Sequence, residues 1–221
     1  MKGIKIILMD MSVMLFSTAK ANGNTQLDTY RDVIFAQAPT ANGGSKDLKL
    51  NIYKGKGVVP QPVVLFVHGG AWVSGDNNIE GSGSEQIRAI MQLREKGVTI
   101  AAPTYRFSNE AIFPAQIHDI KAAIRYLKAN AKKYGIDPNR IMTMGESAGS
   151  QLALLAAVSN GEDAMEGTIG GNINVDSKVT GCVDCYGMTD FLTLASDLYA
   201  RPDLGRTDKQ VYELVEDKNS S

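Results

Sequence analysis

Short apolar segments alternate with longer amphipathic segments along most of this chain, beginning near Thr29. This alternation predicts a mostly parallel β-sheet with helices on both faces. Residues 63–67 form a continuous β-branched and aromatic run, typical of a strand buried on both faces. The other expected strands are residues 30–37, 48–53, 98–102, 141–144 and 179–186, the first two joined as a hairpin across Pro39 and Asn42-Gly43-Gly44.

The segments between these strands carry apolar residues at helical spacing. The apolar positions within 87–93 precede Gly97, and those within 117–127 precede Gly135, so each glycine predicts a helix end. Residues 151–158 predict a third helix that is apolar on most sides. These elements indicate an α/β protein, a three-layer α/β/α sandwich around a mostly parallel central sheet.

The first 21 residues have the layout of a secretory signal. Lys2 and Lys5 precede an apolar stretch, which ends in Ala19-Lys20-Ala21, a small-residue cleavage pattern. We therefore expect residues 1–21 to be a signal peptide and the protein to be periplasmic or secreted. Asp10 interrupts the apolar stretch, and the alternative is an amphipathic first strand or helix of the mature protein. No other stretch approaches the about 18 apolar residues of a membrane span.

Composition narrows the class of protein further. The chain has 221 residues and a formal net charge of -1, which does not fit the basic surface that nucleic-acid binding needs. Cys182 and Cys185 are too few for a disulfide framework or a structural zinc site, and we expect no metal and no organic cofactor. Within a strand these two cysteines are best interpreted as buried small side chains.

Gly145-Glu146-Ser147-Ala148-Gly149 matches G-x-S-x-G and lies between an expected strand and an expected helix. A sharp turn at this point strains the serine backbone and lifts its hydroxyl above the sheet. The glycines on either side avoid collisions with the neighbouring strand and helix. The new helix directs its free N–H groups at the space over Ser147, where an anion would be stabilised.

A second glycine-bearing segment, His68-Gly69-Gly70-Ala71-Trp72, follows the most apolar strand. Small residues let such a loop bring backbone N–H groups close to a substrate oxygen, and each donor in an oxyanion site contributes about 3 kcal/mol. An ordinary glycine-rich turn would explain this segment alone. Its position before the G-x-S-x-G segment, with each segment after a buried strand, favours a catalytic role.

Together these segments resemble the α/β-hydrolase fold, in particular secreted esterases related to hormone-sensitive lipase and the acetyl and feruloyl esterases of plant cell-wall ester groups. The resemblance runs from about Tyr30 to Asp190. Besides the two segments above, it is carried by Tyr105-Arg106, Phe113-Pro114-Ala115-Gln116, Tyr134-Gly135-Ile136-Asp137-Pro138, Arg140-Ile141 and Tyr186-Gly187-Met188-Thr189-Asp190.

The resemblance implies that Ser147 is the nucleophile and that the N–H groups of Gly70, Ala71 and Ala148 form the oxyanion hole. Lipase relatives often have a third glycine where this chain has Ala71, a small departure because the donor is a backbone N–H.

The same resemblance gives structural roles to neighbouring side chains. His68 is expected to support the loop, Arg106 and Asp119 to form an ion pair, and Glu146 to point away from the substrate. Trp72 either lines the substrate pocket or is packed.

The chain departs from the pattern at the catalytic base. Members of this fold place the nucleophile before the acid and the histidine, yet none of the 74 residues after Ser147 is a histidine. His118 is expected on a helix against the sheet face, out of reach of the hydroxyl. Asp190 is a structural residue in the family motif. We therefore find no triad acid or histidine and expect a C-terminally truncated hydrolase, with residues 22–221 an incomplete domain.

The leading hypothesis is a serine carboxylic-ester hydrolase for short acyl or feruloyl esters of small molecules or carbohydrates, inactive or weak in this chain. One alternative is a non-catalytic ester- or carbohydrate-binding protein that kept the pocket. Another is a split enzyme completed by a second chain. Residues 179–186 would form an exposed edge strand of central-strand composition, which predicts dimerisation or aggregation through that edge.

Overall fold

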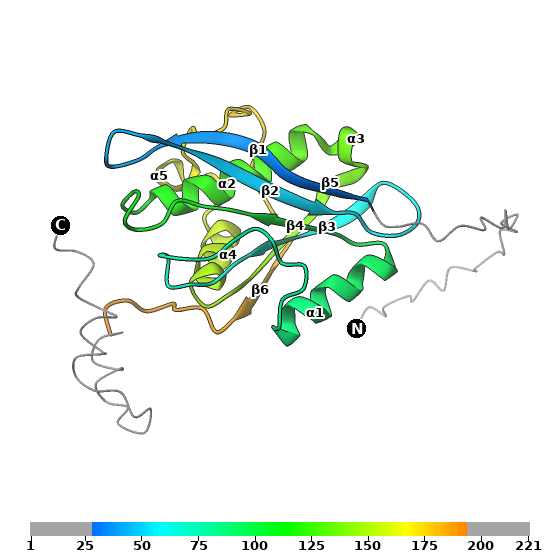
Figure 1. Cartoon of the computed structure of the whole chain (residues 1–221). Helices are drawn as coiled ribbons and strands as arrows, with labels where there is room; N and C mark the ends of the chain where they lie inside the picture. Colours follow the sequence, from blue (N-terminus) through cyan, green and yellow to red (C-terminus); the bar gives the residue numbers. More distant parts are fainter. Residues whose placement is uncertain (1–27, 194–221) are drawn as a thin grey trace, which may run out of the picture.

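The computed structural model describes residues 28–193, which form a six-stranded mixed sheet with helices on both faces (Figure 1). The strand order is β1-β2-β4-β3-β5-β6. The pairs β3–β4, β3–β5 and β5–β6 are parallel, whereas β2 is antiparallel to both β1 and β4. The strands are β1 (Thr29–Pro39), β2 (Ser45–Tyr53), β3 (Gln61–Val67), β4 (Thr99–Pro103), β5 (Ile136–Glu146) and β6 (Cys182–Cys185).

The helices form the outer two layers of the expected sandwich. On one face lie α1 (Glu85–Gln92) and the 3-10 turn η1 (Leu93–Lys96). On the other face lie α2 (Ala115–Ala129) and α4 (Ala148–Val158), and the short helices α3 (Ala131–Tyr134) and α5 (Asp163–Glu166) contact α2 (Figure 1). The structure therefore confirms the predicted fold class.

Strand β3 shows how the sheet separates two cores. Its residues Val63, Leu65 and Val67 pack on the side of α2 and α4, and the alternate residues Val64 and Phe66 pack on the side of α1. All five are buried. A strand with apolar residues at every position can satisfy both layers, which is why its sequence has no polar alternation.

The helix expected to continue to Gly135 is interrupted at Asn130, which separates α2 from α3. The Tyr126 carbonyl accepts from both the side-chain amide and the backbone N–H of Asn130, at 2.9 and 3.0 Å, and Asn130 itself leaves the helical conformation, with a φ of -106° and a ψ of 19°. Gly135, with a φ of 58°, ends α3 as predicted.

Strands β5 and β6 differ most in length from the prediction. Strand β5 begins five residues earlier than expected, because Ile136 pairs with Gln61 across a register shift. Strand β6 covers only Cys182–Cys185, the residues in register with the end of β5. Both cysteines are free and half-buried, so the expectation of full burial was wrong, and partial burial raises the pKa of both thiols.

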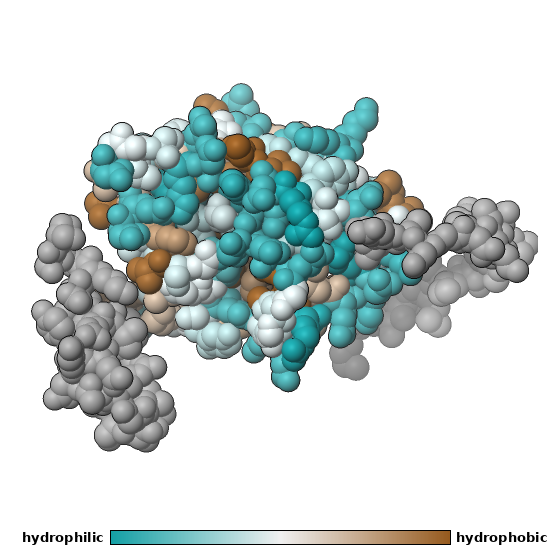
Figure 2. Space-filling model, viewed as in Figure 1, coloured by the Kyte–Doolittle hydropathy of each residue, from teal (hydrophilic) through white to brown (hydrophobic). Residues whose placement is uncertain are grey.

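The face of the molecule shown in Figure 2 is mainly polar. On the face shown in Figure 2, apolar side chains appear as small separate groups among polar ones. None of the described helices has both the length and the apolar character that crossing a bilayer needs. The expected signal peptide lies outside the described residues.

Candidate active site

Ser147 stands between the last residue of β5 and the first residue of α4. Its φ of 52° and ψ of -122° lie outside the regions that side-chain-bearing residues normally occupy. Its backbone N–H donates to the Cys185 carbonyl at 3.0 Å, which anchors the turn to β6. Within the described residues its hydroxyl makes no hydrogen bond, so it is available to a substrate. The predicted strained turn is present.

The glycine loop lies directly against this turn. A Cβ added to Gly69 would lie 2.8 Å from the Glu146 carbonyl oxygen and 3.4 Å from the Ser147 Cβ. A Cβ on Gly149 would collide with backbone atoms of Val67 and His68. Residues about 80 positions apart thus meet at van der Waals distance, and only glycine permits the contact.

The loop holds its own backbone in a strained arrangement. Gly70, Ala71 and Trp72 have φ values of 115°, 51° and 60°. The N–H groups of Val73 and Ser74 both donate to the Gly70 carbonyl, at 3.0 and 3.1 Å. Within residues 28–193 the N–H groups of Gly70 and Ala71 donate to no acceptor, and Ala148 opens α4 with a free N–H. These donors, predicted as the oxyanion hole, therefore remain open.

Positive φ values concentrate around this site. Among the described non-glycine residues six have a positive φ, and Ala71, Trp72, Ser147 and Tyr186 belong to the loop, the turn or the end of β6. Each strained residue costs about 1–3 kcal/mol and persists only where its surroundings enforce it. Such clustering is characteristic of functional sites.

His68 supports the loop, as the sequence resemblance implied. Its Nδ1 lies 2.8 Å from the Gly69 carbonyl oxygen, and its ring stacks on Tyr105 at 4.4 Å. The Tyr105 hydroxyl donates to the His68 carbonyl at 3.0 Å. Burial lowers the pKa of His68, so the ring is neutral near pH 7. These contacts fix the start of the loop, while the buried Nε2 of His68 has no hydrogen-bond partner among the described residues.

Arg106 and Asp119 form the expected buried ion pair. The guanidinium donates to both carboxylate oxygens, at 2.7 and 2.9 Å, and the Arg106 backbone N–H adds a third bond of 2.9 Å. Arg106 also donates to the carbonyls of Pro39 and Ala115. The pair therefore connects the segment after β4 to the start of α2, a structural function.

The other candidate side chains have partners away from the Ser147 hydroxyl. The His118 Nε2 lies 2.9 Å from the Ala164 carbonyl oxygen, where α2 meets α5. Glu146 accepts at 2.8 Å from the hydroxyl of Ser84, the N-cap of α1. Trp72 is partly buried and its ring centroid lies 5.6 Å from that of Phe191.

The sequence did not predict a hydrogen-bond network between α4 and β6. The Asp184 carboxylate accepts from the Ser150 hydroxyl and, at 2.9 Å, from the Gly187 N–H. The Ser150 hydroxyl in turn accepts from the Cys185 N–H at 2.7 Å. This network joins the first turn of α4 to β6. In the sequence, the only feature that pointed to this network was Ser150, which directly follows the G-x-S-x-G segment.

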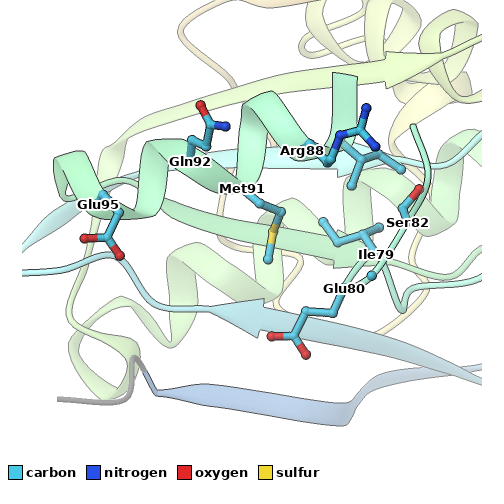
Figure 3. Close-up of a pocket in the computed structure, with 9 residues that line it drawn as sticks. Ile79, Glu80, Ser82, Arg88, Met91, Gln92 and Glu95 are labelled. Atoms are coloured by element: carbon cyan, nitrogen blue, oxygen red, sulfur yellow. The ribbon is translucent and has the colours of Figure 1, made fainter. Parts of the chain in front are cut away.

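One cavity among the described residues is lined by α1, η1 and the segment 79–82. It has a volume of about 590 Å³ and contains none of the predicted site residues. In Figure 3, Met91 extends from α1 toward the segment that carries Ile79 and Glu80. No group of three or more His, Cys, Asp or Glu side chains among residues 28–193 is arranged to hold a metal ion.

The sheet order, the strained serine turn and the glycine loop define a protein of the α/β-hydrolase fold with a serine nucleophile turn. Within this fold the chain belongs to the BD-FAE family, whose model matches residues 50–216.

Named relatives agree with this assignment. Esterase LipQ of Mycobacterium tuberculosis is 32% identical over 73% of this chain and 37% of that protein. A solved structure titled as a truncated form of a carbohydrate esterase from gut microbiota is 31% identical, covers 76% of this chain and 60% of its own, and has a TM-score of 0.64. A bifunctional GH43-CE protein of Bacteroides eggerthii is 31% identical over 75% of this chain and 22% of its own, also with a TM-score of 0.64. The chain spans about a third of the length of the curated relatives it matches.

Proposed function

We propose that this protein is a serine carboxylic-ester hydrolase that forms an acyl-enzyme on Ser147, with short acyl or feruloyl esters as substrates. The observation that carries the proposal is the contact between the strained Ser147 turn and the loop with free N–H groups. The esterase names of several relatives support the same class of reaction.

The geometry supports one sequence of events. The Ser147 hydroxyl attacks the ester carbonyl carbon, and the carbonyl oxygen becomes an oxyanion facing the N–H groups of Gly70, Ala71 and Ala148. The positive end of α4 adds to this stabilisation. Collapse of the tetrahedral intermediate releases the alcohol and leaves the acyl group on Ser147.

The transfer of protons is expected to limit the rate at which this chain hydrolyses an ester. No histidine follows Ser147, and both histidines present have backbone carbonyl partners elsewhere. Without a general base, the oxyanion hole and substrate binding still provide about 10³-fold acceleration over water. Hydrolysis of the acyl-enzyme also needs a base, so the acyl group should accumulate on the serine.

The experiment measures p-nitrophenyl acetate hydrolysis together with peptide mass spectrometry. We expect slow, Ser147-dependent release of p-nitrophenol and an acetyl group on Ser147, both lost in Ser147→Ala. Ser159→Ala, which removes a hydroxyl from the other end of α4, is the matched control and should behave like the parent. Hydrolysis unchanged in Ser147→Ala would reject the proposal, and turnover at ordinary enzyme rates would reject the limitation by proton transfer.

Neither histidine has a hydrogen bond to Ser147 among the described residues, which also favours a second candidate function, ester binding without turnover. Saturable binding of an acylated sugar without acetylation of Ser147 would support it. Ordinary turnover restored by a second polypeptide that carries an acid and a histidine would instead indicate a split enzyme.

We also propose that the protein is exported to the periplasm or secreted. The basic start, apolar stretch and Ala19-Lys20-Ala21 pattern support this location. Amino-terminal sequencing of the protein from the expressing host should then begin at Asn22. An intact Met1 in the cytosolic fraction would contradict export.

A further inference from the structure

The hydrogen bonds between α4 and β6 close a ring around the nucleophile turn. The Ser147 N–H donates to the Cys185 carbonyl at 3.0 Å, the Cys185 N–H donates to the Ser150 hydroxyl oxygen at 2.7 Å, and the Ser150 N–H donates to the Ser147 carbonyl at 3.0 Å. The backbone N–H and the backbone carbonyl of Ser147 are therefore both bonded within this ring. A shift of Cys185 relative to α4 would act directly on the strained residue that bears the nucleophilic hydroxyl.

The ring includes a side chain at only one point, the hydroxyl of Ser150. Ser150 is fully buried, with an exposed fraction of 0%. A hydroxyl has one proton and two lone pairs, so it accepts from the Cys185 N–H only while its proton points elsewhere. That proton is donated to the Asp184 carboxylate. Asp184 therefore sets the direction of the lone pair that holds Cys185.

Without this carboxylate, the Ser150 hydroxyl has a competing type of partner nearby. Serine hydroxyls within helices commonly donate to the carbonyl three or four residues earlier. For Ser150 these are the carbonyls of Ser147 and Glu146. A bond of this kind would turn the lone pair away from the Cys185 N–H and open the ring.

The backbone after β6 holds the Asp184 carboxylate in place. The Gly187 N–H donates at 2.9 Å to Oδ1 of Asp184, the same oxygen that accepts from the Ser150 hydroxyl. A Cβ on Gly187 would lie 2.5 Å from this oxygen and 2.9 Å from the Gln151 backbone nitrogen, so only glycine fits here. Because one oxygen receives both hydrogen bonds, the uncharged side-chain oxygen of an asparagine would also be able to receive them.

Strand β6 needs such a connection because it is short and lies at the edge of the described sheet. It has four residues and pairs only with β5 among the described strands. Its last residue, Cys185, is the one that accepts from the Ser147 N–H. The bond from Cys185 to Ser150 fixes this end of the strand to α4, the helix that begins directly after the nucleophile.

We propose that Ser150 and Asp184 are positioning residues for the nucleophile. Asp184 orients the Ser150 hydroxyl, and Ser150 holds Cys185 and through it the conformation in which Ser147 attacks an ester. The effect on acylation rests on the proposed ester-hydrolase function. The effect on the conformation of the Ser147 turn does not depend on that function and can be measured separately.

The chain offers a matched control away from the nucleophile turn. The Ser177 hydroxyl donates to both oxygens of the Glu166 carboxylate, at 2.8 and 2.9 Å. Like Ser150, Ser177 is buried, with an exposed fraction of 2%. Ser177→Ala therefore removes the same kind of hydrogen bond, from a buried hydroxyl to a carboxylate, without changing the ring around Ser147.

The experiment measures two quantities in the full chain and its variants. The first is the rate of Ser147 acetylation by p-nitrophenyl acetate, followed by peptide mass spectrometry over a range of ester concentrations. This series separates the maximal acetylation rate from the half-saturating concentration. The second quantity is the hydrogen–deuterium exchange rate of the Ser147 amide without ester, followed by NMR. Circular dichroism checks that each variant is folded.

We expect Ser150→Ala and Asp184→Ala to lower the maximal acetylation rate about tenfold, because a displaced nucleophile reacts more slowly, and to leave the half-saturating concentration unchanged. Loss of the ring should make exchange of the Ser147 amide about fivefold faster in both variants. Asp184→Asn should stay within about threefold of the parent in both quantities, because its side-chain oxygen still accepts both bonds. Ser177→Ala should match the parent.

Each outcome decides a specific point. Equal effects of Ser150→Ala and Ser177→Ala, or parental exchange of the Ser147 amide in a folded Ser150→Ala, overturn the proposal. If Ser150→Ala does not fold, the exposed position Asp184 decides, and a loss in Asp184→Asn equal to that in Asp184→Ala overturns the orienting role. Faster Ser147 exchange in Ser150→Ala and Asp184→Ala, with no acetylation of the parent, supports the positioning and rejects the ester-hydrolase function. The two failures are therefore distinguishable.

Discussion

The strain at Ser147 provides a quantitative test of the active-site geometry. Ser147→Ala and Ser147→Gly both remove the hydroxyl, but only the glycine variant also removes the Cβ that disfavours a φ of 52°. Because the hydroxyl makes no hydrogen bond among the described residues, its loss affects both variants equally. Their difference in stability therefore measures the backbone strain.

The magnitude follows from two opposing contributions. Relief of a strained backbone contributes about 1–3 kcal/mol to the stability of the glycine variant. The greater freedom of glycine in the unfolded chain costs about 0.4–1 kcal/mol. We therefore expect Ser147→Gly to be more stable than Ser147→Ala by about 1 kcal/mol, a difference in Tm of about 3 °C for a chain of this size.

The assay is urea unfolding followed by circular dichroism, with thermal unfolding as a second measure. Ser159 is the matched control, because it terminates the same helix with an ordinary φ of -107°. At this position Ser159→Ala should be more stable than Ser159→Gly, by about 0.4–1 kcal/mol. If Ser147→Ala equalled or exceeded Ser147→Gly in stability, the turn would carry no strain and the argument for an enforced nucleophile geometry would fail.

Three further predictions concern the supporting structure. Asp119→Ala leaves the Arg106 guanidinium buried without its carboxylate, so urea unfolding should show a loss of about 3–5 kcal/mol; exposed Asp163→Ala should change stability by no more than about 0.5 kcal/mol. Burial lowers the pKa of His68 in the folded protein below its ordinary 6.5, so neutral His68 contributes to stability above pH 6.5, and this contribution is lost as the pH falls through the folded-state pKa. His68→Gln should therefore flatten this part of the curve of stability against pH. An unchanged curve would contradict a lowered pKa at His68. Val183 is 40% exposed on β6, so the parent should self-associate in size-exclusion chromatography and Val183→Lys should reduce the association; a monomeric parent at high concentration would refute pairing through this edge.

The fold class and the central site could be predicted because their signals are local. The apolar run 63–67 needs burial on both faces, and the structure places it at the centre of the sheet. Ser147 lies in a strand–turn–helix segment that occupies consecutive residues, so the sequence of that segment indicates the turn, and contacts with β6 and the glycine loop hold it. The glycine loop could be linked to it only through resemblance, since nothing local predicts a contact across about 80 residues.

Element ends were harder to predict. Helix α2 ends at Asn130, whose φ of -106° and ψ of 19° are not helical and whose side chain donates to the Tyr126 carbonyl, although the apolar spacing alone allowed the helix to continue. Strand β6 ends where its register with β5 ends, although its apolar composition extended further. In both cases the backbone conformation and the pairing at one position set the end of the element, and the apolar pattern contains neither.

The amino-acid sequence by itself determined the alternation of elements, the strained nucleophile turn and the lack of a histidine after it, because these depend on neighbouring residues and on composition. Only the tertiary structure decided that Ser84 holds Glu146, that Ser150 joins Asp184 and that Asn51 bonds both Asp32 and Asn77. Each of these contacts joins residues that are 19 to 62 positions apart. Chain folding sets such distances, and the periodicity of a single segment contains no information about them.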